Sequence, residues 1–349
     1  MEKRPIVLKA GTENPHPVTG IEYPIPECLN SLRKVADVMV VNDENETTIL
    51  NAIKGVSVLM ITYGQVTRKV IEAGLPTLKA VIKLGTGIDS IDIDAAKENG
   101  VRVINCPDYA QNAVAEGAFL LLMNCMKKFG PIHRFVNEQG WMGPSERNKG
   151  RNLEKKRIGF VGLGHINSRF ACMCQGFDME LQAFDPYVNQ TTMETKNITK
   201  VEHLDDLMTS SDVVAVCLPL NNETDGLISE KRLRLMKSSA FLINVSRGAI
   251  VDEQALLKVL KERLIAGCGL DVFSGEPLQK KGHPLSEFLS MDQVVITPHL
   301  AAWTHETWEQ LQQEVYRNVM DVLEGRDSVI ISSDPRLRNQ SGCVYPNQY

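Results

Sequence analysis

Three side chains in the second half of the chain have the types and spacing for proton transfer and anion binding. Arg247 lies in INVSRGAIVD, Glu276 in GLDVFSGEP and His299 in ITPHLAAWT, each at or just after the end of an apolar run. A histidine titrates near neutral pH, a carboxylate partner favours its charged form, and an arginine offers a two-pronged fork to a carboxylate. Taken singly, they could be a salt-bridge arginine, a helix-capping glutamate and a surface histidine.

A glycine-rich stretch upstream has the pattern of a phosphate-binding loop. GLGHIN, Gly162 to Asn167, follows the apolar run RIGFV and opens a helical stretch, SRFACMCQGF. The first glycine permits a tight turn, and Gly164 lets the backbone approach a pyrophosphate at the helix N-terminus. Asn167 replaces the third glycine, which serves helix-to-strand packing. We expect it to alter the packing distance, or to be absorbed by a small neighbour, without abolishing phosphate binding. The alternative is a plain strand-turn-helix.

Asp185 stands at the end of the next apolar run, MELQAF. It lies 21 residues beyond Gly164, close to the ~20 of a dinucleotide-binding unit. Its carboxylate can accept hydrogen bonds from ribose hydroxyls and would repel a 2′-phosphate, and the following Pro186 and Tyr187 offer no arginine to bind one. This pattern favours NAD over NADP, although an aspartate at a strand end can also be a simple turn former.

These residues fall within two series of alternating strands and helices, which favour parallel sheets covered by helices. We predict a long buried helix over 112–128 at a domain crossing, a surface loop over 140–151, and a helix over 306–323 long enough to return to the first domain. The tail 328–349 is predicted to be extended or partly disordered. The predicted strands are PIVLKA, ADVMVV, VSVLMIT, LKAVIKL and VRVIN in the first half, then RIGFVG, MELQAFD, DVVAVCLP, AFLINVS, IAGCGLDV and QVVITPH.

Length and composition narrow the class of protein. The 349 residues fit two domains, and 43% hydrophobic with 23% charged residues is typical of a globular protein. A net charge of −5 without a basic, aromatic-rich block argues against nucleic acid, and no run approaches a membrane span or signal peptide, so a cytoplasmic setting is expected. Eight scattered cysteines, of which only Cys172 and Cys174 are close, indicate neither a metal site nor disulfides.

Between about Gly55 and Gly325 the chain resembles the D-isomer-specific 2-hydroxyacid dehydrogenases. The resemblance rests on GTGIDSIDIDAAKENGVRVINCPDYAQNAVAE, the glycine loop, LPLNNETDGLI, LMKSSAFLINVSRGAIVDEQAL, AGCGLDVFSGEPL and ITPHLAAWT. Departures are Asn167, His165 where arginine is common, Trp303 where a small residue is common, and the irregular tail. The resemblance implies an α/β fold with a flavodoxin-like substrate domain (1–111), a Rossmann-type NAD-binding domain (112–303) and a C-terminal helix and tail (304–349) returning to the substrate domain.

The resemblance also implies roles for individual residues. Arg247 would hold the substrate carboxylate and carbonyl oxygen, His299 would be the general acid/base and Glu276 its partner, while Asp271 would contact the nicotinamide carboxamide. No metal is expected. The expected cofactor-binding residues are Gly162, Gly164, His165, Ile166, Asp185, Pro219, Thr224, Val245, Ser246 and Asp271, and the expected substrate-binding residues are Tyr63, Gly85, Thr86, Gly87, Arg247 and His299.

The activity implied is hydride transfer between NAD and a small 2-oxo or 2-hydroxy acid in a homodimer paired through the cofactor domain. A non-enzymatic NAD-sensing scaffold resembling the C-terminal-binding corepressors is the alternative, and an S-adenosylmethionine methyltransferase leaves the three polar residues unexplained. The substrate stays open. It could be glyoxylate or hydroxypyruvate, or an acid with a second anionic group near Lys83 or Arg68. Specificity is expected from residues 63–67, Thr86 and aromatic groups such as Trp141 and Trp303. Trp303 would either limit the size of the substrate side chain or pack between the domains. The absence of a regulatory domain after the last helix argues against a regulated 3-phosphoglycerate dehydrogenase.

Overall fold

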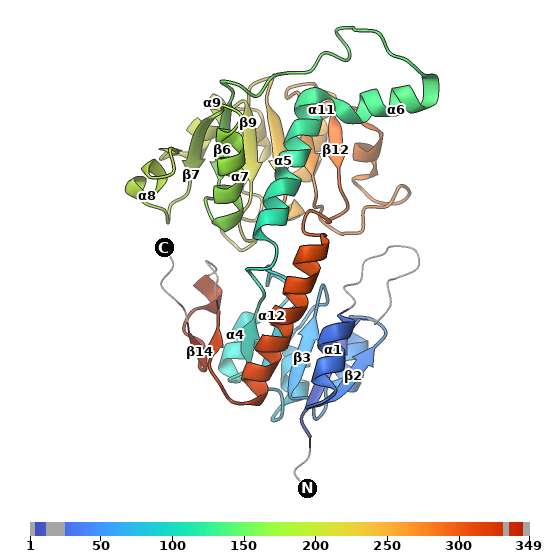
Figure 1. Ribbon diagram of the computed structural model, residues 1–349, viewed down its shortest axis with the longest axis vertical. Helices are drawn as coiled ribbons and strands as arrows, with labels where there is room; N and C mark the ends of the chain where they lie inside the picture. The colour runs from blue at the N-terminus through green and yellow to red at the C-terminus, as the bar shows by residue number, and fades with distance from the viewer. Residues whose placement is uncertain (1–3, 12–24, 331–334, 345–349) are drawn as a thin grey trace. The chain divides into compact units, whose positions relative to one another are not determined.

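A computed structural model describes residues 4–11, 25–330 and 335–344, and it divides the chain into two compact units. Unit 1 consists of Met1–Ala110 together with Thr304–Tyr349, and unit 2 of Gln111–Trp303. Figure 1 labels many of their helices and strands. Each unit is an α/β body built on a parallel sheet, so the predicted fold class is confirmed.

The sheet of unit 1 has five parallel strands in the order β2-β1-β3-β4-β5, the order of flavodoxin-like sheets. Its strands are β1 (Ile6–Ala10), β2 (Asp37–Val41), β3 (Val58–Ile61), β4 (Ala80–Lys83) and β5 (Arg102–Ile104). Its helices are α1 (Pro26–Leu32), α2 (Glu46–Ala52), α3 (Arg68–Gly74), α4 (Ile93–Glu98) and α12 (His305–Leu323).

Helix α12 joins unit 1 although it lies near the end of the chain. Its apolar stripe, including Leu311, Val315 and Val319, is buried in the same core as the five strands. A capping box formed by Thr304 and Thr307 starts the helix. The Gln312 side chain then accepts hydrogen bonds from two backbone N–H groups in the first turn of α1. The helix is therefore fixed to unit 1 by both apolar packing and polar contacts.

The sheet of unit 2 has seven parallel strands in the order β12-β11-β10-β9-β6-β7-β8, with the direction of winding reversed between β6 and β9. Such a reversal is where open parallel sheets bind ligands. The strands are β6 (Arg157–Val161), β7 (Glu180–Phe184), β8 (Thr199–Lys200), β9 (Val213–Val216), β10 (Phe241–Asn244), β11 (Gly267–Leu270) and β12 (Val294–Ile296). The helices are α5 (Gln111–Lys127), α6 (Phe129–Gln139), α7 (His165–Gln175), α8 (Gln190–Glu194), α9 (Leu204–Ser210), α10 (Glu230–Leu233) and α11 (Glu253–Lys261), with 3₁₀ turns at Gly248–Ile250 and Ser286–Ser290.

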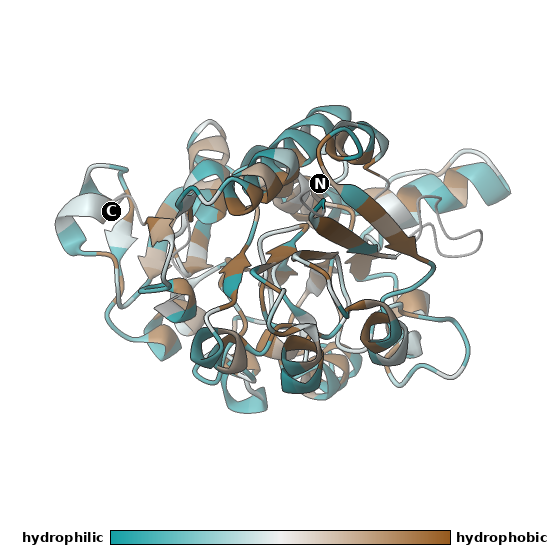
Figure 2. Cartoon of the chain, turned by 90° about the horizontal axis from the view of Figure 1, so that it is seen from below, coloured by the Kyte–Doolittle hydropathy of each residue, from teal (hydrophilic) through white to brown (hydrophobic). Residues whose placement is uncertain are grey.

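The strands of both sheets are mainly apolar because helices cover both faces, whereas the helices alternate between polar and apolar positions (Figure 2). Helix α5 lies directly on its sheet. A Cβ on Gly269 of β11 would come within 2.9 Å of the Leu121 side chain, and one on Gly117 within 2.7 Å of the Ala301 side chain. This close packing places α5 against the segment that carries His299.

Three features differ from the sequence expectations or were absent from them. Within the tail, β13 (Ser328–Val329) pairs with β14 (Cys343–Val344), and a 3₁₀ turn spans Pro335–Leu337. The tail is therefore ordered where it is described; residues 331–334 and 345–349 lie outside the described part. Helix α6 and the short edge strand β8 had no counterpart in the expected elements.

Two observations bear on the class of protein. No helix in the described segments is long and apolar enough to cross a membrane. All eight cysteines are free thiols, and the side chains of the close pair diverge, with Cys172 exposed and Cys174 buried.

Candidate active site

The glycine loop of unit 2 has a geometry that suits a dinucleotide phosphate. Gly162 has φ +81°, a backbone conformation that disfavours any residue with a side chain. A Cβ there would also lie 2.9 Å from the Cys217 carbonyl oxygen, which is too close. Gly164 precedes α7, and a Cβ on it would meet nothing within 4 Å, so the space beside this backbone is open. The first helical residues, the exposed His165 and the half-buried Ile166, lie at the positive end of the helix dipole.

The Asp185 carboxylate ties this loop to the end of β7. One of its oxygens accepts the Leu163 N–H at 2.8 Å and the other accepts the Tyr187 N–H at 2.8 Å. An ionised carboxylate offers about four acceptor positions, so two remain for ribose hydroxyls. The side chain is half-buried, and its orientation is fixed by the backbone before any nucleotide binds.

Asn167, at the position of the third glycine, turns its side chain back toward the loop. The residue is 1% exposed, and its Nδ2 donates to the Gly162 carbonyl oxygen at 2.7 Å. The side chain is thus accommodated by a hydrogen bond rather than by a small neighbour. This bond holds the carbonyl of the residue with positive φ, while the N–H groups at the helix start lie elsewhere in the loop.

We expect Asn167→Gly to change the dissociation constant for NAD by less than tenfold. The variant loses the 2.7 Å hydrogen bond to the Gly162 carbonyl, whose net value is about 1 kcal/mol, and a weak one of 3.4 Å to the Val161 carbonyl. A tenfold change requires about 1.4 kcal/mol. Titration calorimetry with NADH measures this. Ser168→Gly is the matched control for glycine in the first turn, because the Ser168 side chain makes no hydrogen bond among the described residues. A larger effect confined to Asn167→Gly would mean that Asn167 contacts the cofactor.

The remaining expected cofactor residues follow β9 and β10. Pro219 is exposed, and its carbonyl accepts the Thr224 hydroxyl at 2.6 Å, which closes the 219–224 loop. Val245 and Ser246 are buried directly after β10. The Ser246 N–H and hydroxyl both donate to the side-chain oxygen of Asn244, at 3.1 Å and 2.8 Å. These loops lie at the carboxyl ends of β9, which pairs with β6, and of β10, which pairs with β9.

His299 and Glu276 form a hydrogen-bonded pair after β12 and β11. His299 Nδ1 lies 2.8 Å from a carboxylate oxygen of Glu276, and both side chains are less than one-third exposed. The other carboxylate oxygen accepts the Phe273 N–H at 2.9 Å. Burial raises the pKa of Glu276. The opposing effects are larger, so the pKa is lowered overall: they are the hydrogen bond to His299, the charge of His299, the hydrogen bond from the Phe273 N–H and the charge of Arg247. An ionised Glu276 accepts the Nδ1 proton, which leaves Nε2 as the nitrogen that can exchange a proton with a substrate.

Asp271 holds the turn that presents His299. Its carboxylate accepts the Thr297 hydroxyl at 2.6 Å and the backbone N–H groups of Leu300 and Ala301 at 3.0 and 3.1 Å, and its carbonyl accepts the His299 N–H at 2.7 Å. His299 itself has φ +56°, a left-handed conformation that is uncommon outside glycine. The family resemblance implies a contact between Asp271 and the nicotinamide carboxamide. The structure gives its carboxylate a local task, which is to fix the backbone of the acid/base candidate.

Arg247 follows β10 and lies close enough to Glu276 for its charge to lower the pKa of that carboxyl. Its carbonyl accepts the Asn244 side-chain amide at 2.9 Å. A Cβ on the next residue, Gly248, would fall 2.2 Å from the Ser274 backbone nitrogen, so only glycine lets the Arg247 loop approach the Glu276 loop this closely. Ser274 N–H in turn donates to both carboxylate oxygens of the buried Glu253 at 3.1 Å.

Unit 1 carries the expected substrate loops at the carboxyl ends of β3 and β4. Tyr63 follows β3 and is 39% exposed. Gly85, with φ +143°, begins the second loop, and its N–H bonds to the Lys83 carbonyl at 3.0 Å. The next two residues, Thr86 and Gly87, donate no backbone hydrogen bond within the described parts of the chain. Two successive backbone N–H groups at a loop tip suit a carboxylate.

The other residues considered for specificity have varied surroundings. Arg68 is engaged with Glu98 at 2.6 Å on the surface. Lys83 is buried, donates to the Thr62 carbonyl and lies 5.4 Å from the Tyr63 ring centroid. Trp141 is 93% exposed and Trp303 46% exposed. Both cations are therefore already engaged within unit 1.

Sequence reasoning missed three residues that hold the site in place. Asn244 and Glu253 organise the Arg247 and Glu276 loops, and Glu44 holds the Tyr63 loop. Asn244 had a signal, because a polar residue ends the buried strand FLIN just before the arginine loop. The two glutamates act on residues distant in sequence, which no local pattern marks.

The site of unit 2 therefore combines a phosphate-binding loop with a histidine–carboxylate pair and an arginine, on strands of one sheet. The described part of the chain contains no group of three or more His, Cys, Asp or Glu side chains that could hold a metal ion. Such a set can bind an anionic substrate beside a dinucleotide and move one proton.

Comparison with known proteins defines the class. The family model for the NAD binding domain of the D-isomer specific 2-hydroxyacid dehydrogenases matches residues 119–301. A glyoxylate reductase of Pyrococcus furiosus is 34% identical over 318 residues, which are 88% of this chain and 93% of that protein. The chain therefore belongs to the D-isomer-specific 2-hydroxyacid dehydrogenase family, and the predicted resemblance is confirmed.

Other relatives differ in length and in name. A D-3-phosphoglycerate dehydrogenase of Synechocystis sp. is 34% identical over 300 residues, which cover 85% of this chain and 52% of that protein, so the chain spans about half the length of this relative. Among solved structures, D-lactate dehydrogenase from Aquifex aeolicus complexed with NAD and lactic acid has a TM-score of 0.80 and 27% identity, covering 92% of this chain and 96% of that one.

Proposed function

We propose that the protein is an NAD-dependent D-2-hydroxyacid dehydrogenase acting as a 2-oxo acid reductase, with His299 as general acid/base. The observation that carries this is the 2.8 Å contact between His299 Nδ1 and Glu276, in the unit that also bears the glycine loop and Arg247. The similar proteins named above are dehydrogenases and reductases, which favours an enzyme over a binding scaffold.

Each residue of the site has a separate proposed role in the reduction of a 2-oxo acid. Bound NADH would supply the hydride to the substrate C2. Arg247 would hold the substrate carboxylate and orient the carbonyl oxygen by its two-pronged fork. His299 Nε2 would donate the proton that neutralises the developing alkoxide, and in the reverse direction it would take that proton back. Glu276, ionised because its pKa is lowered, would stabilise the charged imidazole. In unit 1, the N–H groups of Thr86 and Gly87 would bind a carboxylate.

NAD rather than NADP is the cofactor that Asp185 favours. Its carboxylate is held by the N–H groups of Leu163 in the glycine loop and of Tyr187 after β7, so a 2′-phosphate placed there would meet a fixed negative charge. The two residues after it, Pro186 and Tyr187, carry no positive charge that would offset this repulsion.

The test is a panel of 2-oxo acids that vary in chain length and in a second charged group, each assayed with NADH and with NADPH. We expect turnover of at least one small 2-oxo acid, with kcat/KM for NADH at least about tenfold above that for NADPH. A panel without turnover would refute the proposed activity. Turnover with an NADPH preference would refute only the role of Asp185.

We also propose that two copies pair through unit 2. Large apolar side chains are exposed along α5, α6 and the following loop: Leu120, Phe129, Phe135, Val136 and Trp141. An exposed apolar surface of this kind is characteristic of an interface. Sedimentation at micromolar concentration should give the mass of a dimer, and Phe129→Glu should shift it to a monomer. A wild-type monomer under these conditions contradicts the proposal.

A further inference from the structure

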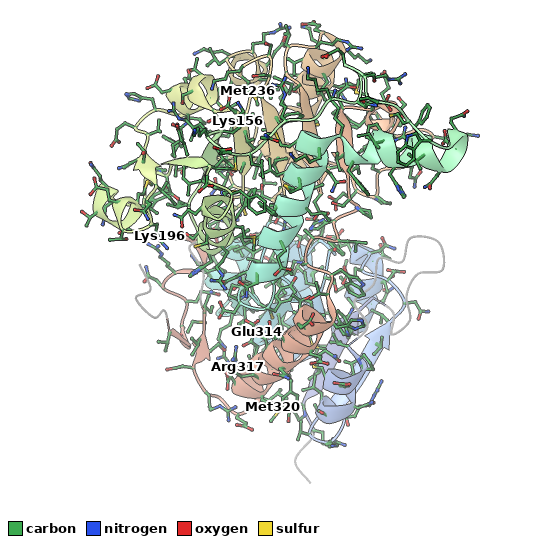
Figure 3. All side chains as sticks on the ribbon, turned by 45° about the horizontal axis from the view of Figure 1, so that its top comes forward. Lys156, Lys196, Met236, Glu314, Arg317 and Met320 are labelled. Atoms are coloured by element: carbon green, nitrogen blue, oxygen red, sulfur yellow. The ribbon has the colours of Figure 1, made fainter. Side chains whose placement is uncertain are left out.

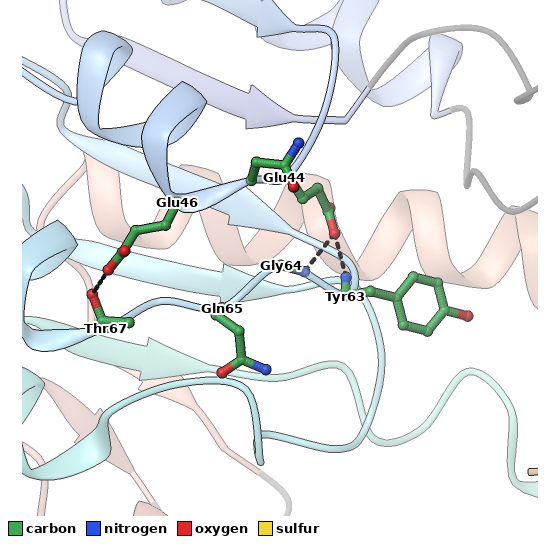
Figure 4. A pocket seen from close by; sticks show the side chains of 7 residues that line it. Glu44, Glu46, Tyr63, Gly64, Gln65 and Thr67 are labelled. Carbon is green, nitrogen blue, oxygen red and sulfur yellow. Dashed lines mark hydrogen bonds between the residues drawn. The ribbon is translucent and has the colours of Figure 1, made fainter. Parts of the chain in front are cut away.

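A carboxylate from the chain itself occupies a row of three backbone donors next to Tyr63. One oxygen of Glu44 accepts the Thr62 N–H, and the other accepts those of Tyr63 and Gly64, each at 2.5 Å. Figure 4 shows two of these bonds, with the Tyr63 ring directed away from Glu44. A pocket of about 540 Å³ is lined by Glu44, Asn45, Glu46, Tyr63, Gly64, Gln65 and Thr67.

The approach of Glu44 to this loop is built into the backbone of unit 1. A Cβ on Gly64 would lie 2.7 Å from both the Cβ and the carbonyl oxygen of Glu44, so the two loops touch backbone to backbone only because residue 64 is glycine. The ammonium of the buried Lys9 and a carboxylate oxygen of Glu44 lie 3.0 and 3.5 Å from the position of a Cβ on Gly11. A positive charge is thus close to the Glu44 carboxylate.

The two candidate substrate loops differ in whether their backbone N–H groups already have a hydrogen-bond partner. At the end of β3, the three N–H groups already bind a carboxylate. At the end of β4, the N–H groups of Thr86 and Gly87 make no bond within the described residues. A substrate carboxylate would therefore bind the second loop, and the first would present the Tyr63 side chain from a fixed backbone.

We propose that Glu44 is a positioning residue that holds the Tyr63 loop for substrate binding. This inference rests on the proposed function. The Glu44 carboxylate does not touch the reacting atoms in this proposal. It acts by fixing residues 62–64, and its loss would loosen the wall of the substrate site while leaving the dinucleotide loop and the His299–Glu276 pair of unit 2 unchanged.

The test compares Glu44→Gln with wild type. A glutamine amide has one acceptor oxygen, and its NH₂ group cannot accept, so at least one of the three N–H groups loses its partner and all lose the charge. We expect KM for the best 2-oxo acid to rise about tenfold, with kcat within about threefold and the NADH dissociation constant within about twofold of wild type. Amide hydrogen exchange of residues 60–67 should accelerate at least about tenfold.

Two further variants make the result specific. Asp43→Asn is the control. It removes the charge of a neighbouring carboxylate that accepts the Asn45 N–H and does not bind the Tyr63 loop. It should change neither KM nor exchange. Gly64→Ala keeps Glu44 but forces it away, and should reproduce the effect of Glu44→Gln. Gly64→Ala also tests the role of Glu44 in case the Glu44→Gln variant does not fold.

The outcomes separate this inference from the proposed activity. A KM within about twofold of wild type in both Glu44→Gln and Gly64→Ala overturns it, with or without faster exchange. If wild type turns over no 2-oxo acid, the proposed activity fails, and the exchange of residues 60–67 then decides alone whether Glu44 holds the loop.

Discussion

Replacing His299 by alanine is expected to lower kcat for 2-oxo acid reduction by about 10²- to 10⁴-fold, the usual contribution of a positioned general acid. This corresponds to roughly 3 to 5 kcal/mol of transition-state stabilisation. The NADH dissociation constant should stay near the wild-type value, because the glycine loop and Asp185 follow other strands of the sheet. Steady-state kinetics and NADH titration measure the two quantities.

The backbone at this position calls for a second variant. His299 has φ +56°, which alanine adopts at a cost but asparagine tolerates. His299→Asn therefore keeps the conformation and removes the acid, and should lose kcat to a similar extent. His203→Ala, an exposed histidine of the same unit, is the control and should retain full activity. If His299→Asn keeps more than about a tenth of the wild-type kcat, the proposed role is wrong. A scaffold would instead show no turnover in wild type.

Replacing Glu314 by glutamine is expected to stabilise the protein at alkaline pH and to have little effect at pH 5. Glu314 is a buried carboxyl on α12, where Figure 3 labels it beside Arg317. Burial and the charge of Asp108 raise its pKa from 4.5 to about 7, against the smaller opposing effects of Arg317 and the backbone N–H groups of Asp108 and Tyr109. The folded protein therefore holds a proton on Glu314 that the unfolded chain releases between pH 4.5 and 7.

This difference in bound protons determines how the unfolding free energy changes with pH. Because the folded state binds more protons in that window, stability falls as pH rises through it, by up to about 3 kcal/mol. The Glu314→Gln variant has no such proton to lose. Urea unfolding at pH 5 and pH 8.5 should show a larger gain in unfolding free energy at pH 8.5. Glu309→Gln, at an exposed position of the same helix, is the control. An equal change at both pH values would show that Glu314 is ionised in the folded protein.

The sequence predicted the strands well and the helices less evenly. Each predicted apolar run contains an observed strand, because strands buried on both faces of a parallel sheet must be apolar throughout. The helix predicted over 112–128 is observed as Gln111–Lys127. Helix α6 was missed although Phe129, Ile132 and Val136 recur at helical spacing, because Gly130 and Pro131 near its start are typical of a turn and the helix buries no residue. The described part of the tail includes extended strands, as predicted, but their pairing could not be predicted because they pair across a gap in sequence.

The sequence also predicted only part of the candidate site. The types and positions of Arg247, Glu276 and His299 were visible as polar residues at strand ends. That Asp271 binds the turn around His299, rather than only facing a cofactor, was not visible, because its partners lie at residues 297–301. Asn167 could be recognised as a departure from the glycine pattern, but the direction of its side chain could not.

The sequence by itself determined the family and the two parallel sheets, and it predicted candidate residues for dinucleotide binding and proton transfer, since these depend on local patterns of apolar runs, glycines and polar strand ends. Only the tertiary structure decided which carboxylate serves which donor: Glu276 binds His299, Asp271 the turn around it, and Glu44 the loop of Tyr63. The reason is physical. Each of these bonds joins segments far apart in the chain, and their approach is set by sheet register and by glycines such as Gly64 and Gly248, where backbones meet.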